Sequence, residues 1–437
     1  MLDKDWQKYY NAVESVRTLN PTGKVTKVTG IIAEGYCAGT GVGSVCSILN
    51  SDNEEIKAEV VGFNEKRIVL MPYGETRGLS VGCQITLKDE KPFVQVGDAF
   101  LGRVINGLGD PIDEKGPIIA DDVYSLYGKV SNPLDREQIT QYVDVGVGVI
   151  NSMITIGKGQ RIAIMAGSGV GKSILMGMIA KHTTADVSVI ALIGERGREV
   201  KEFVEKILGE EGIKRSVVVA ATSDSSPLVR IRATYLAKTI AEYFKNQGKD
   251  VLLIMDSITR FAMSSRDVGL AAGEPPTLRG YTPSFFIQLP KLLERAGNFQ
   301  GKGSITGIYT VLVEGDDMND PVGDSVRSIV DGHIVLSRDL ANKGHYPSID
   351  VLASISRCMR DTITKEHVEL YQKVIDILAT YKNSEDIITI GAYVDGSDPK
   401  IDYAKSMIDK INLFLKQDMN EKVSFEVGLN KLRALFY

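Results

Sequence analysis

The spacing of apolar residues changes three times along the 437-residue chain. Large apolar side chains of the first segment, residues 1–20, recur at intervals that place them on one side of a helix. They are Trp6, Tyr9, Tyr10, Val13 and Val16. This segment is predicted to be an amphipathic helix. Its apolar stripe can pack on its own domain or dock a partner, and the spacing leaves both possibilities open.

Short β-rich runs fill the next segment, residues 21–95. Runs such as KVTKVTGIIAEGY and QITLKD are separated by glycines and by clusters of Asn, Asp and Glu. This pattern predicts a small antiparallel β-barrel or sandwich. In the stretch LGRVINGLGDPID that follows (101–113), Gly107, Gly109 and Pro111 predict a turn-rich link without regular structure.

Strand and helix patterns alternate through residues 150–358. Apolar runs typical of buried strands are RIAIMA, VSVIALIG, SVVVAATS, VLLIMDS and SITGIYTVLV, and helical patterns such as REVKEFVEKILGEE lie between them. This alternation predicts an α/β domain with a mostly parallel sheet. In residues 365–437 two further amphipathic patterns, TKEHVELYQKVIDILATYK and KIDYAKSMIDKINLFLKQ, predict a separate C-terminal α-helical domain.

Composition narrows the possible classes of protein. The chain is 43% hydrophobic and 24% charged, as expected for a globular protein, and its net charge of −5 argues against a nucleic-acid coat. Four cysteines without CxxC spacing and four scattered histidines predict neither a disulfide framework nor a zinc site. With no signal peptide or long apolar segment recognised, a cytoplasmic protein is expected.

A candidate phosphate-binding loop, AGSGVGKS (166–173), lies between a predicted strand and a predicted helix. Small residues let backbone N–H groups surround a phosphate, and the following helix presents its positive N-terminus. Lys172 would reach the β- and γ-phosphates and Ser173 would bind Mg²⁺. Ala166 stands where the motif has glycine, and an extended strand end tolerates it. The predicted nucleotide contacts are Gly167, Ser168, Gly169, Val170, Gly171, Lys172, Ser173 and Ile174.

The glycine-rich GTGVGS at 39–44 lacks a lysine and falls in the β-rich segment, so a simple turn is expected there. Two carboxylates, by contrast, follow apolar strands of the α/β segment. Asp256 ends VLLIMD and can hold the Mg²⁺ shell, while Glu195 follows VIALIG and can orient the attacking water. The alternative for Glu195 is a helix-capping role.

For two residues of HYPSIDVLASISR (345–357), the sequence pattern allows two different roles. Arg357 can be a surface ion-pairing group or an arginine finger donated to a neighbouring subunit. Tyr346 can be a packed aromatic or a stacking partner for adenine.

Taken together, these motifs resemble the catalytic subunits of the rotary ATPase family, and within it the flagellar type III protein export ATPases. The resemblance rests on AGSGVGKS, LIGERGREVKEF, VLLIMDSITRFA, GEPPTLRGYTPSFF, LPKLLERAG, VLVEGDDMNDPVGDSVRSIVDGHIVLSR and HYPSIDVLASISR, with LGRVINGLGDPID as the family's interdomain link. It extends over nearly the whole chain beyond residue 20. It implies a β-barrel domain (21–95), a RecA-like P-loop ATPase core (96–364) and a C-terminal helical domain (365–437).

The resemblance also implies residue roles. Lys172 and Ser173 match the P-loop pair, Glu195 the water-activating glutamate, and Asp256 the Walker B aspartate that holds Mg²⁺ through water. Arg196 and Arg260 match arginines that flank the phosphates. Arg357 matches the finger that completes the adjacent subunit's site, and Tyr346 the aromatic that contacts adenine.

Partners follow from the same resemblance. It implies ATP and Mg²⁺ as ligands, a homohexamer, a dimeric stator-like regulator at the N-terminal helix, and a central stalk protein. Export substrates, their chaperones and an export gate at the membrane are further implied partners, with the ring peripheral at the inner face of the cytoplasmic membrane. Nucleic acid is not an expected partner.

Three alternatives stay open at this point. The injectisome ATPases of virulence secretion share nearly all of these motifs. A ring subunit that binds nucleotide without hydrolysing it would share the P-loop, although such subunits generally lack the glutamate found here as Glu195. An RNA-driven hexameric helicase shares the core, but the acidic balance argues against it.

We expect deletion of residues 1–18 to abolish binding of the dimeric stator-like regulator, because the apolar stripe would be its docking surface. Nucleotide binding should persist, since the P-loop lies in another domain. Co-purification of the regulator with the full-length and shortened chains, beside a nucleotide-binding assay, tests this. Retained regulator binding by the shortened chain would refute it.

Overall fold

The computed structural model describes residues 20–128, 130–313 and 320–437, so the predicted N-terminal helix lies outside the described residues. The chain divides into two compact units. One holds the chain up to Phe93 together with the short segments Ser226–Leu228 and Asp267–Pro275, and the other holds the rest.

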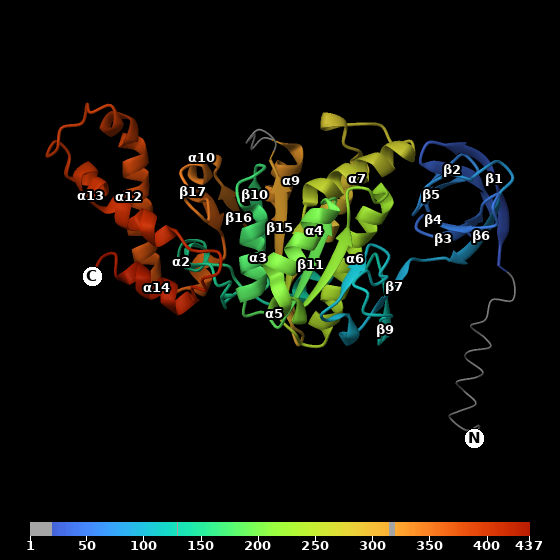
Figure 1. Cartoon of the computed structure of the whole chain (residues 1–437), viewed down its shortest axis with the longest axis horizontal. Coiled ribbons are helices and arrows are strands. Elements are labelled where there is room, and N and C mark those ends of the chain that lie inside the picture. Colours follow the sequence, from blue (N-terminus) through green and yellow to red (C-terminus); the bar gives the residue numbers. More distant parts are fainter. Residues whose placement is uncertain (1–19, 129, 314–319) are drawn as a thin grey trace, which may run out of the picture. The chain divides into compact units, whose positions relative to one another are not determined.

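Six antiparallel strands of the first unit close into a barrel in the order β1-β2-β5-β4-β3-β6 (Figure 1). They are β1 (Thr22–Thr29), β2 (Ile32–Cys37), β3 (Val45–Leu49), β4 (Glu55–Asn64), β5 (Arg67–Pro72) and β6 (Gln84–Asp89). Alternate side chains such as Cys46 and Ile48 of β3 fill the interior. The predicted β-rich domain is thus confirmed, and it is a barrel rather than a sandwich.

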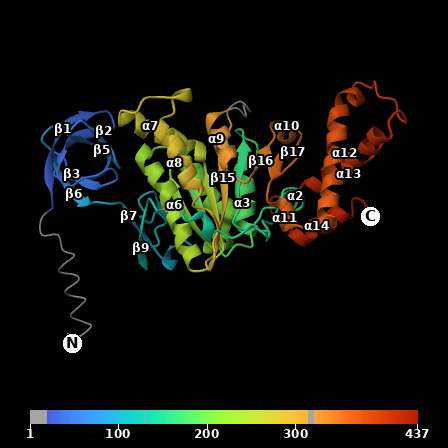
Figure 2. The same ribbon diagram turned by 180° about the vertical axis from the view of Figure 1, so that it is seen from behind.

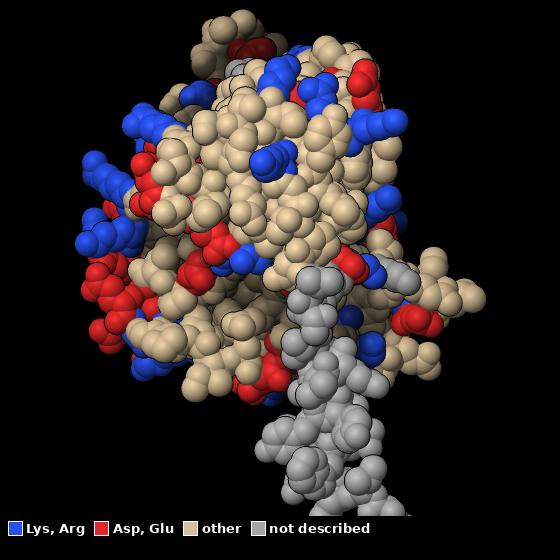
Figure 3. Space-filling view, turned by 90° about the vertical axis from the view of Figure 1, so that its right-hand side faces the viewer, with Lys and Arg blue, Asp and Glu red and all other residues tan. Residues whose placement is uncertain are grey.

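Apolar side chains also lie on the outside of this barrel. Val42 and Val81 are 68% and 70% exposed. Figure 3 shows one face of the molecule as mostly uncharged, with Lys or Arg within it and side chains of both charge signs around it. A face of mixed charge differs from the continuous basic surface that binds a nucleic-acid backbone.

A nine-stranded sheet forms the centre of the second unit, in the order β17-β16-β10-β15-β13-β11-β12-β8, with β14 paired to β15. Its strands are β8 (Val104–Asn106), β10 (Arg161–Ala166), β11 (Val187–Ile193), β12 (Ser216–Ala221), β13 (Val251–Asp256), β14 (Gly297–Asn298), β15 (Ser304–Leu312), β16 (Gly332–Leu336) and β17 (Ile349–Ser356). The pairs β16–β17 and β14–β15 are antiparallel and the others are parallel. The mostly parallel sheet and its five predicted strands are confirmed.

The link at 101–113 differs from its prediction. Gly109 does have a left-handed φ of 96°, in a turn where the Asn106 side chain accepts hydrogen bonds from the backbone N–H groups of Leu108 and Asp110. However, β8 immediately before this turn pairs with β12 at the sheet edge. The strand was missed because three residues are too few to establish a period of two.

Helices cover both faces of the sheet (Figures 1 and 2). One face carries α3 (Lys172–His182), α4 (Gly197–Glu202) and α5 (Gly209–Lys214), and the other carries α6 (Pro227–Asn246) and α8 (Pro283–Leu293). The remaining helices of the core are α2 (Gly148–Met153), α7 (Ile258–Ala271), α9 (Pro321–Ile329), α10 (Arg338–Asn342) and α11 (Met359–Thr362), and β7 (Phe93–Val96) and β9 (Asp122–Ser125) form a separate two-stranded ribbon. Strands covered on both faces explain the continuous apolar runs of the sequence.

The run REVKEFVEKILGEE is helical as predicted, but it is not one continuous α-helix. A π-helical segment, Phe203–Leu208, separates α4 from α5. This segment packs on α3, the helix that follows the candidate phosphate-binding loop, because Gly177 of α3 leaves room for Ile207. The close approach fixes α3 against the element that follows Glu195.

The C-terminal part is helical, as predicted, and contains α12 (Lys365–Thr389), α13 (Pro399–Leu415) and α14 (Phe425–Arg433). Each helix begins at a side-chain cap, provided by Thr364, Asp398 and Ser424 respectively. The short α14 was not predicted, because nine residues show little more than two helical turns. Apolar side chains of all three helices join the core that lies on the α3 face of the sheet.

Gly177→Ala should destabilise the second unit. A Cβ atom at this position would lie 1.8 Å from Ile207 Cγ2, so α3 and the π-helical segment would have to move apart. We expect a loss of about 2 kcal/mol in the free energy of unfolding, measured by denaturant titration. Gly197→Ala is the matched control, because nothing lies within 4 Å of its Cβ position. Equal effects of the two substitutions would contradict the packing argument.

Candidate active site

The loop 167–171 joins β10 to α3 at the carboxyl end of the sheet. Gly169 and Gly171 have left-handed φ angles of 79° and 90°, which only glycine adopts without strain, and α3 begins at Lys172. Ala166 is the last residue of β10 and pairs with Leu312 of β15 and Leu336 of β16. Because its backbone is extended, alanine fits there as expected.

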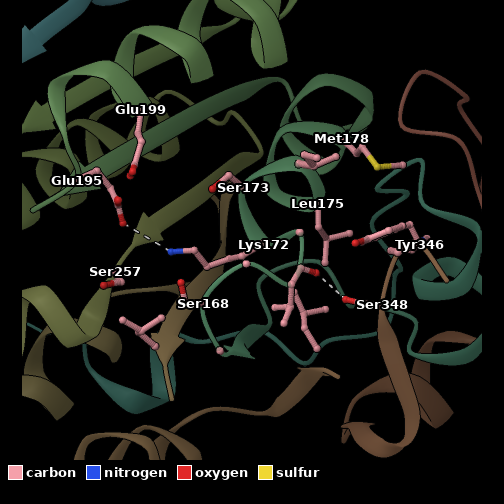
Figure 4. A pocket seen from close by; sticks show the side chains of 18 of the residues that line it. Ser168, Lys172, Ser173, Leu175, Met178, Glu195, Glu199, Ser257, Tyr346 and Ser348 are labelled. Carbon is pink, nitrogen blue, oxygen red and sulfur yellow. Dashed lines mark hydrogen bonds and ion pairs between the residues drawn. The ribbon is translucent and has the colours of Figure 1, made fainter. Parts of the chain in front are cut away.

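Three charged side chains of the predicted site converge beside this loop. Lys172 Nζ contacts Asp256 Oδ1 and lies 3.6 Å from Glu195 Oε1, as Figure 4 shows for the latter pair. Asp256 is 2% exposed, and its Oδ1 accepts a 2.6 Å hydrogen bond from Thr310 Oγ1 of β15. The sheet order causes this convergence, because β10, β15, β13 and β11 are neighbours whose carboxyl ends lie at one edge.

Glu195 differs electrostatically from an ordinary surface glutamate. Burial, together with the neighbouring carboxylates of Glu199 and Asp256, raises its pKa to about 7, and the Lys172 ammonium only partly opposes this. A carboxylate with a pKa near neutrality can take up and release a proton at physiological pH. This property suits a general base and does not follow from a helix-capping role.

A cavity of about 890 Å³ opens over the loop. Its lining includes most of the predicted site: Gly167, Ser168, Gly169, Val170, Gly171, Lys172, Ser173, Ile174, Glu195, Arg196, Arg260 and Tyr346. Asp256 lines an adjoining cavity of about 420 Å³ together with Ser173 and Glu195. A nucleoside triphosphate fits a space of this size.

The two predicted phosphate-flanking arginines lie at different depths. Arg196 is 81% exposed at the start of α4 and lies 3.4 Å from Glu199 Oε1. Arg260 is partly buried in the first turn of α7, where its side chain packs against Gly194. Both side chains line the large cavity.

Arg357 is the predicted site residue that lies elsewhere. It directly follows β17, is exposed, and lines neither of the two cavities over the loop. Its backbone N–H donates to the Asp331 carbonyl at 2.9 Å, so its place beyond the edge strand is fixed. Within one chain, therefore, the candidate site does not include this arginine.

Several lining residues were not predicted. Those in the core are Glu199, Arg230, Ser257, Met263 and Ser348, and those after α13 are Gln417, Asp418 and Met419. Glu199 could have been found, because it lies in the first turn of the predicted helix that directly follows Glu195. The sequence gives no signal for residues 417–419, since only the tertiary fold brings them to a loop some 245 residues earlier in the chain.

The oxygen ligands near the loop fit Mg²⁺ held mainly by phosphates and water. Ser173 supplies an exposed hydroxyl and Asp256 a carboxylate, both oxygen ligands of the kind that Mg²⁺ prefers. Among the residues that the structure describes, no group of three or more His, Cys, Asp or Glu side chains could enclose a metal ion by itself.

A strand, a glycine loop, a helix and two strand-end carboxylates define a P-loop nucleotide-binding core. Comparison with known families specifies it further. Residues 36–87 match the ATP synthase alpha/beta family beta-barrel domain, residues 146–356 match the nucleotide-binding domain of that family, and residues 363–434 match the T3SS EscN ATPase C-terminal domain. The chain belongs to the ATP synthase alpha/beta family, in its type III secretion ATPase branch.

Individual relatives agree with this assignment. The chain is 49% identical to the flagellum-specific ATP synthase of Bacillus subtilis over 98% of each protein. It is 45% identical to the type 3 secretion system ATPase of Xanthomonas euvesicatoria, over 94% of this chain and 93% of the relative. The assembled ATPase EscN of enteropathogenic E. coli has the same fold, with a TM-score of 0.90 and 44% identity over 94% of this chain and 99% of EscN.

Glu195→Gln should stabilise the fold in a pH-dependent manner. Because the folded pKa of about 7 exceeds the ordinary value of 4.5, the folded chain holds a proton that the unfolded chain releases between these values. Stability therefore falls as pH rises through this window. We expect the glutamine variant to exceed wild type by about 3 kcal/mol in free energy of unfolding near pH 8 and by almost nothing near pH 4. If the difference in free energy of unfolding between the two chains did not change with pH, the raised pKa of Glu195 would be contradicted.

Proposed function

We propose that the protein hydrolyses Mg²⁺-ATP at the interfaces of a homohexamer and energises protein export through a type III secretion apparatus. The observation that carries the proposal is the convergence of Lys172, Glu195 and Asp256 beside the glycine loop. The family membership supplies the biological setting, since relatives are named as flagellum-specific ATP synthases and type 3 secretion system ATPases.

Nucleotide binding would use both ends of the large cavity. The backbone N–H groups of residues 167–174 and the N-terminus of α3 would hold the phosphates, with Lys172 turned from its carboxylate partners toward the β- and γ-phosphates. Tyr346, 46% exposed at the other side of the loop, would stack against the adenine. Ser173 and, through water, Asp256 would hold Mg²⁺, which neutralises phosphate charge when bound.

Hydrolysis would depend on the protonation state of Glu195. Its carboxylate would orient a water molecule for in-line attack on the γ-phosphate and accept a proton from it. Arg196 and Arg260, which line the same cavity, would stabilise the charge that spreads over the phosphoryl oxygens. While Lys172 lies beside it, the Glu195 carboxyl has a pKa of about 7, within the range in which a general base exchanges protons near neutral pH.

The position of Arg357 supports a shared active site. An arginine that is exposed beyond an edge strand, away from its own chain's cavities, is available to a neighbouring subunit as an arginine finger. A homohexamer with heterologous interfaces would bring each Arg357 to the next subunit's γ-phosphate. The solved EscN structures support this arrangement, because they are of the assembled ATPase alone and with its central stalk EscO.

The other proposed partners belong to the export system. We propose three modules, the barrel (21–95), the ATPase core (96–364) and the helical domain (365–437). The exposed apolar surface of the barrel would contribute to contacts within the ring. The helical domain would face the stalk, export substrates and chaperones. Residues 1–20 would bind the stator-like regulator. No helix among the described residues is long and apolar enough to cross a membrane. The ring would dock at the export gate, on the inner face of the cytoplasmic membrane.

The flagellar system is the setting we favour, with the injectisome as the alternative. Both kinds of relative match at similar identity over nearly the whole chain, and the flagellar ones include the match at 49%. A non-hydrolysing ring subunit is the second candidate function, and Glu195 is the residue that argues against it.

A mixing experiment tests the shared active site. Arg357→Ala should lower the ATPase rate by about 10³-fold or more, and Glu195→Gln by at least about 10²-fold, while each alone retains ATP binding. In mixed rings, some interfaces pair the intact Glu195 of one variant with the intact Arg357 of the other. We therefore expect activity to reappear on mixing, and wild-type activity per subunit to rise with protein concentration.

Two outcomes would contradict the proposal in different ways. Mixtures that stay inactive beside an active wild type would refute the role of Arg357 in the neighbouring site. Full activity of Glu195→Gln would remove the general base and with it the hydrolytic mechanism. A double variant, Arg357→Ala with Glu195→Gln in one chain, is the control, because mixing it with itself can restore no interface.

A further inference from the structure

A buried glutamine connects the proposed adenine-binding side of the cavity to the C-terminal helical domain. Gln417 follows α13, is 8% exposed, and lines the cavity beside Tyr346. We propose that Gln417 is a positioning residue, which holds Tyr346 in place through the backbone and so lets the C-terminal domain set the affinity for the adenine end of the nucleotide. This inference rests on the proposed nucleotide binding.

Both the oxygen and the nitrogen of the Gln417 side-chain amide form hydrogen bonds. Its Oε1 accepts a 2.7 Å hydrogen bond from the Gly148 N–H, and its Nε2 donates to the Gly146 carbonyl at 2.9 Å and to the Glu421 carbonyl at 2.7 Å. Gly146 and Gly148 belong to the core, whereas Glu421 belongs to the segment before α14. One side chain therefore binds both sides of the junction between core and helical domain.

The backbone of the same residue holds the predicted adenine contact. The Gln417 N–H donates to the Tyr346 carbonyl at 3.0 Å. Two residues further, Ser348 Oγ donates to the Val170 carbonyl of the phosphate-binding loop at 2.6 Å, a contact that Figure 4 draws. The segment 346–348 is thus tied to the helical domain at one end and to the phosphate-binding loop at the other.

These contacts restrict the position of the Tyr346 ring. The ring lies 3.5 Å from the place where a Cβ atom on Gly171 would stand, so it packs directly over the loop. Nearly half of Tyr346 is exposed, so side-chain packing alone holds the ring only in part. A shift of residue 417 would move the Tyr346 backbone and the lining residues 418–419 together, while Ser348 would still hold the phosphate-binding loop.

The test distinguishes binding of the adenosine end of the nucleotide from binding of its phosphates. Binding of Mg-ADP and of Mg-pyrophosphate to the full chain is measured by calorimetry for wild type and for Gln417→Met, a variant of similar volume that cannot make the three hydrogen bonds. We expect about tenfold weaker binding of ADP, the loss that corresponds to about 1.4 kcal/mol, and pyrophosphate binding within about twofold of wild type. Tyr346→Ala should give the same pattern, and the double variant little further loss.

Asn151→Leu is the matched control. Asn151 is also a buried amide at this junction, since its Nδ2 donates to Asp144 Oδ1 at 2.8 Å and to the Val423 carbonyl at 3.0 Å, but it does not contact Tyr346. It should lower thermal stability without changing the ratio of ADP to pyrophosphate affinity. Gln417→Glu keeps the acceptor for Gly148 but places a carboxylate oxygen against the Gly146 and Glu421 carbonyls, so it should shift the ratio in the same direction at least as strongly.

The outcomes are distinguishable. Unchanged ADP binding in both Gln417 variants, or an equal loss for ADP and pyrophosphate, would overturn the positioning role while leaving the proposed function intact. A change of the ratio in Asn151→Leu as large as in Gln417→Met would also overturn it, because any damage to the junction would then suffice. A wild-type chain that bound neither ligand would overturn the proposed function and this inference with it.

Discussion

The contact between Lys172 and the two carboxylates at the carboxyl end of the sheet is the constraint on which the site depends. Asp256 is almost fully buried, and burying a carboxylate costs free energy unless a cation and hydrogen-bond donors lie beside it. Lys172 and Thr310 supply these. The same ammonium lies 3.6 Å from Glu195 Oε1 and only partly offsets the burial and the neighbouring carboxylates that raise the pKa of Glu195.

This arrangement requires the strand order and not merely the motifs. Lys172, Thr310, Asp256 and Glu195 come from or follow β10, β15, β13 and β11, four adjacent strands that are not in sequence order. Apolar side chains on both faces of these strands hold their carboxyl ends in register. The close contact of Gly177 with Ile207 further fixes α3, and with it Lys172, against the segment that follows Glu195.

Sequence reasoning reached the features that local pattern determines. The phosphate-binding loop, the five central strands, the helices of the C-terminal domain and the strand-end position of Glu195 were predicted, because each depends on a short local pattern. The site positions of Arg260 and Tyr346 came instead from the family resemblance. What it missed depends on long-range contacts or on very short elements. The strand β8 is three residues long. Over six residues, the spacing of apolar side chains in a π-helix cannot be distinguished from that in an α-helix. Residues 417–419 reach the cavity only through folding.

The distribution of the site over the chain explains why its parts can act in sequence. One chain provides the glycine loop, Lys172 and the two carboxylates proposed as metal ligand and general base, and the sheet holds these rigidly. The adenine-binding side of the cavity is joined to the helical domain by a few hydrogen bonds, and Arg357 follows the edge strand β17 of the sheet. A movement of the helical domain or of a neighbouring subunit can therefore alter the ends of the site without disturbing the charged cluster at its centre. An ATPase whose cycle responds to partners needs this separation of a rigid catalytic centre from adjustable binding elements.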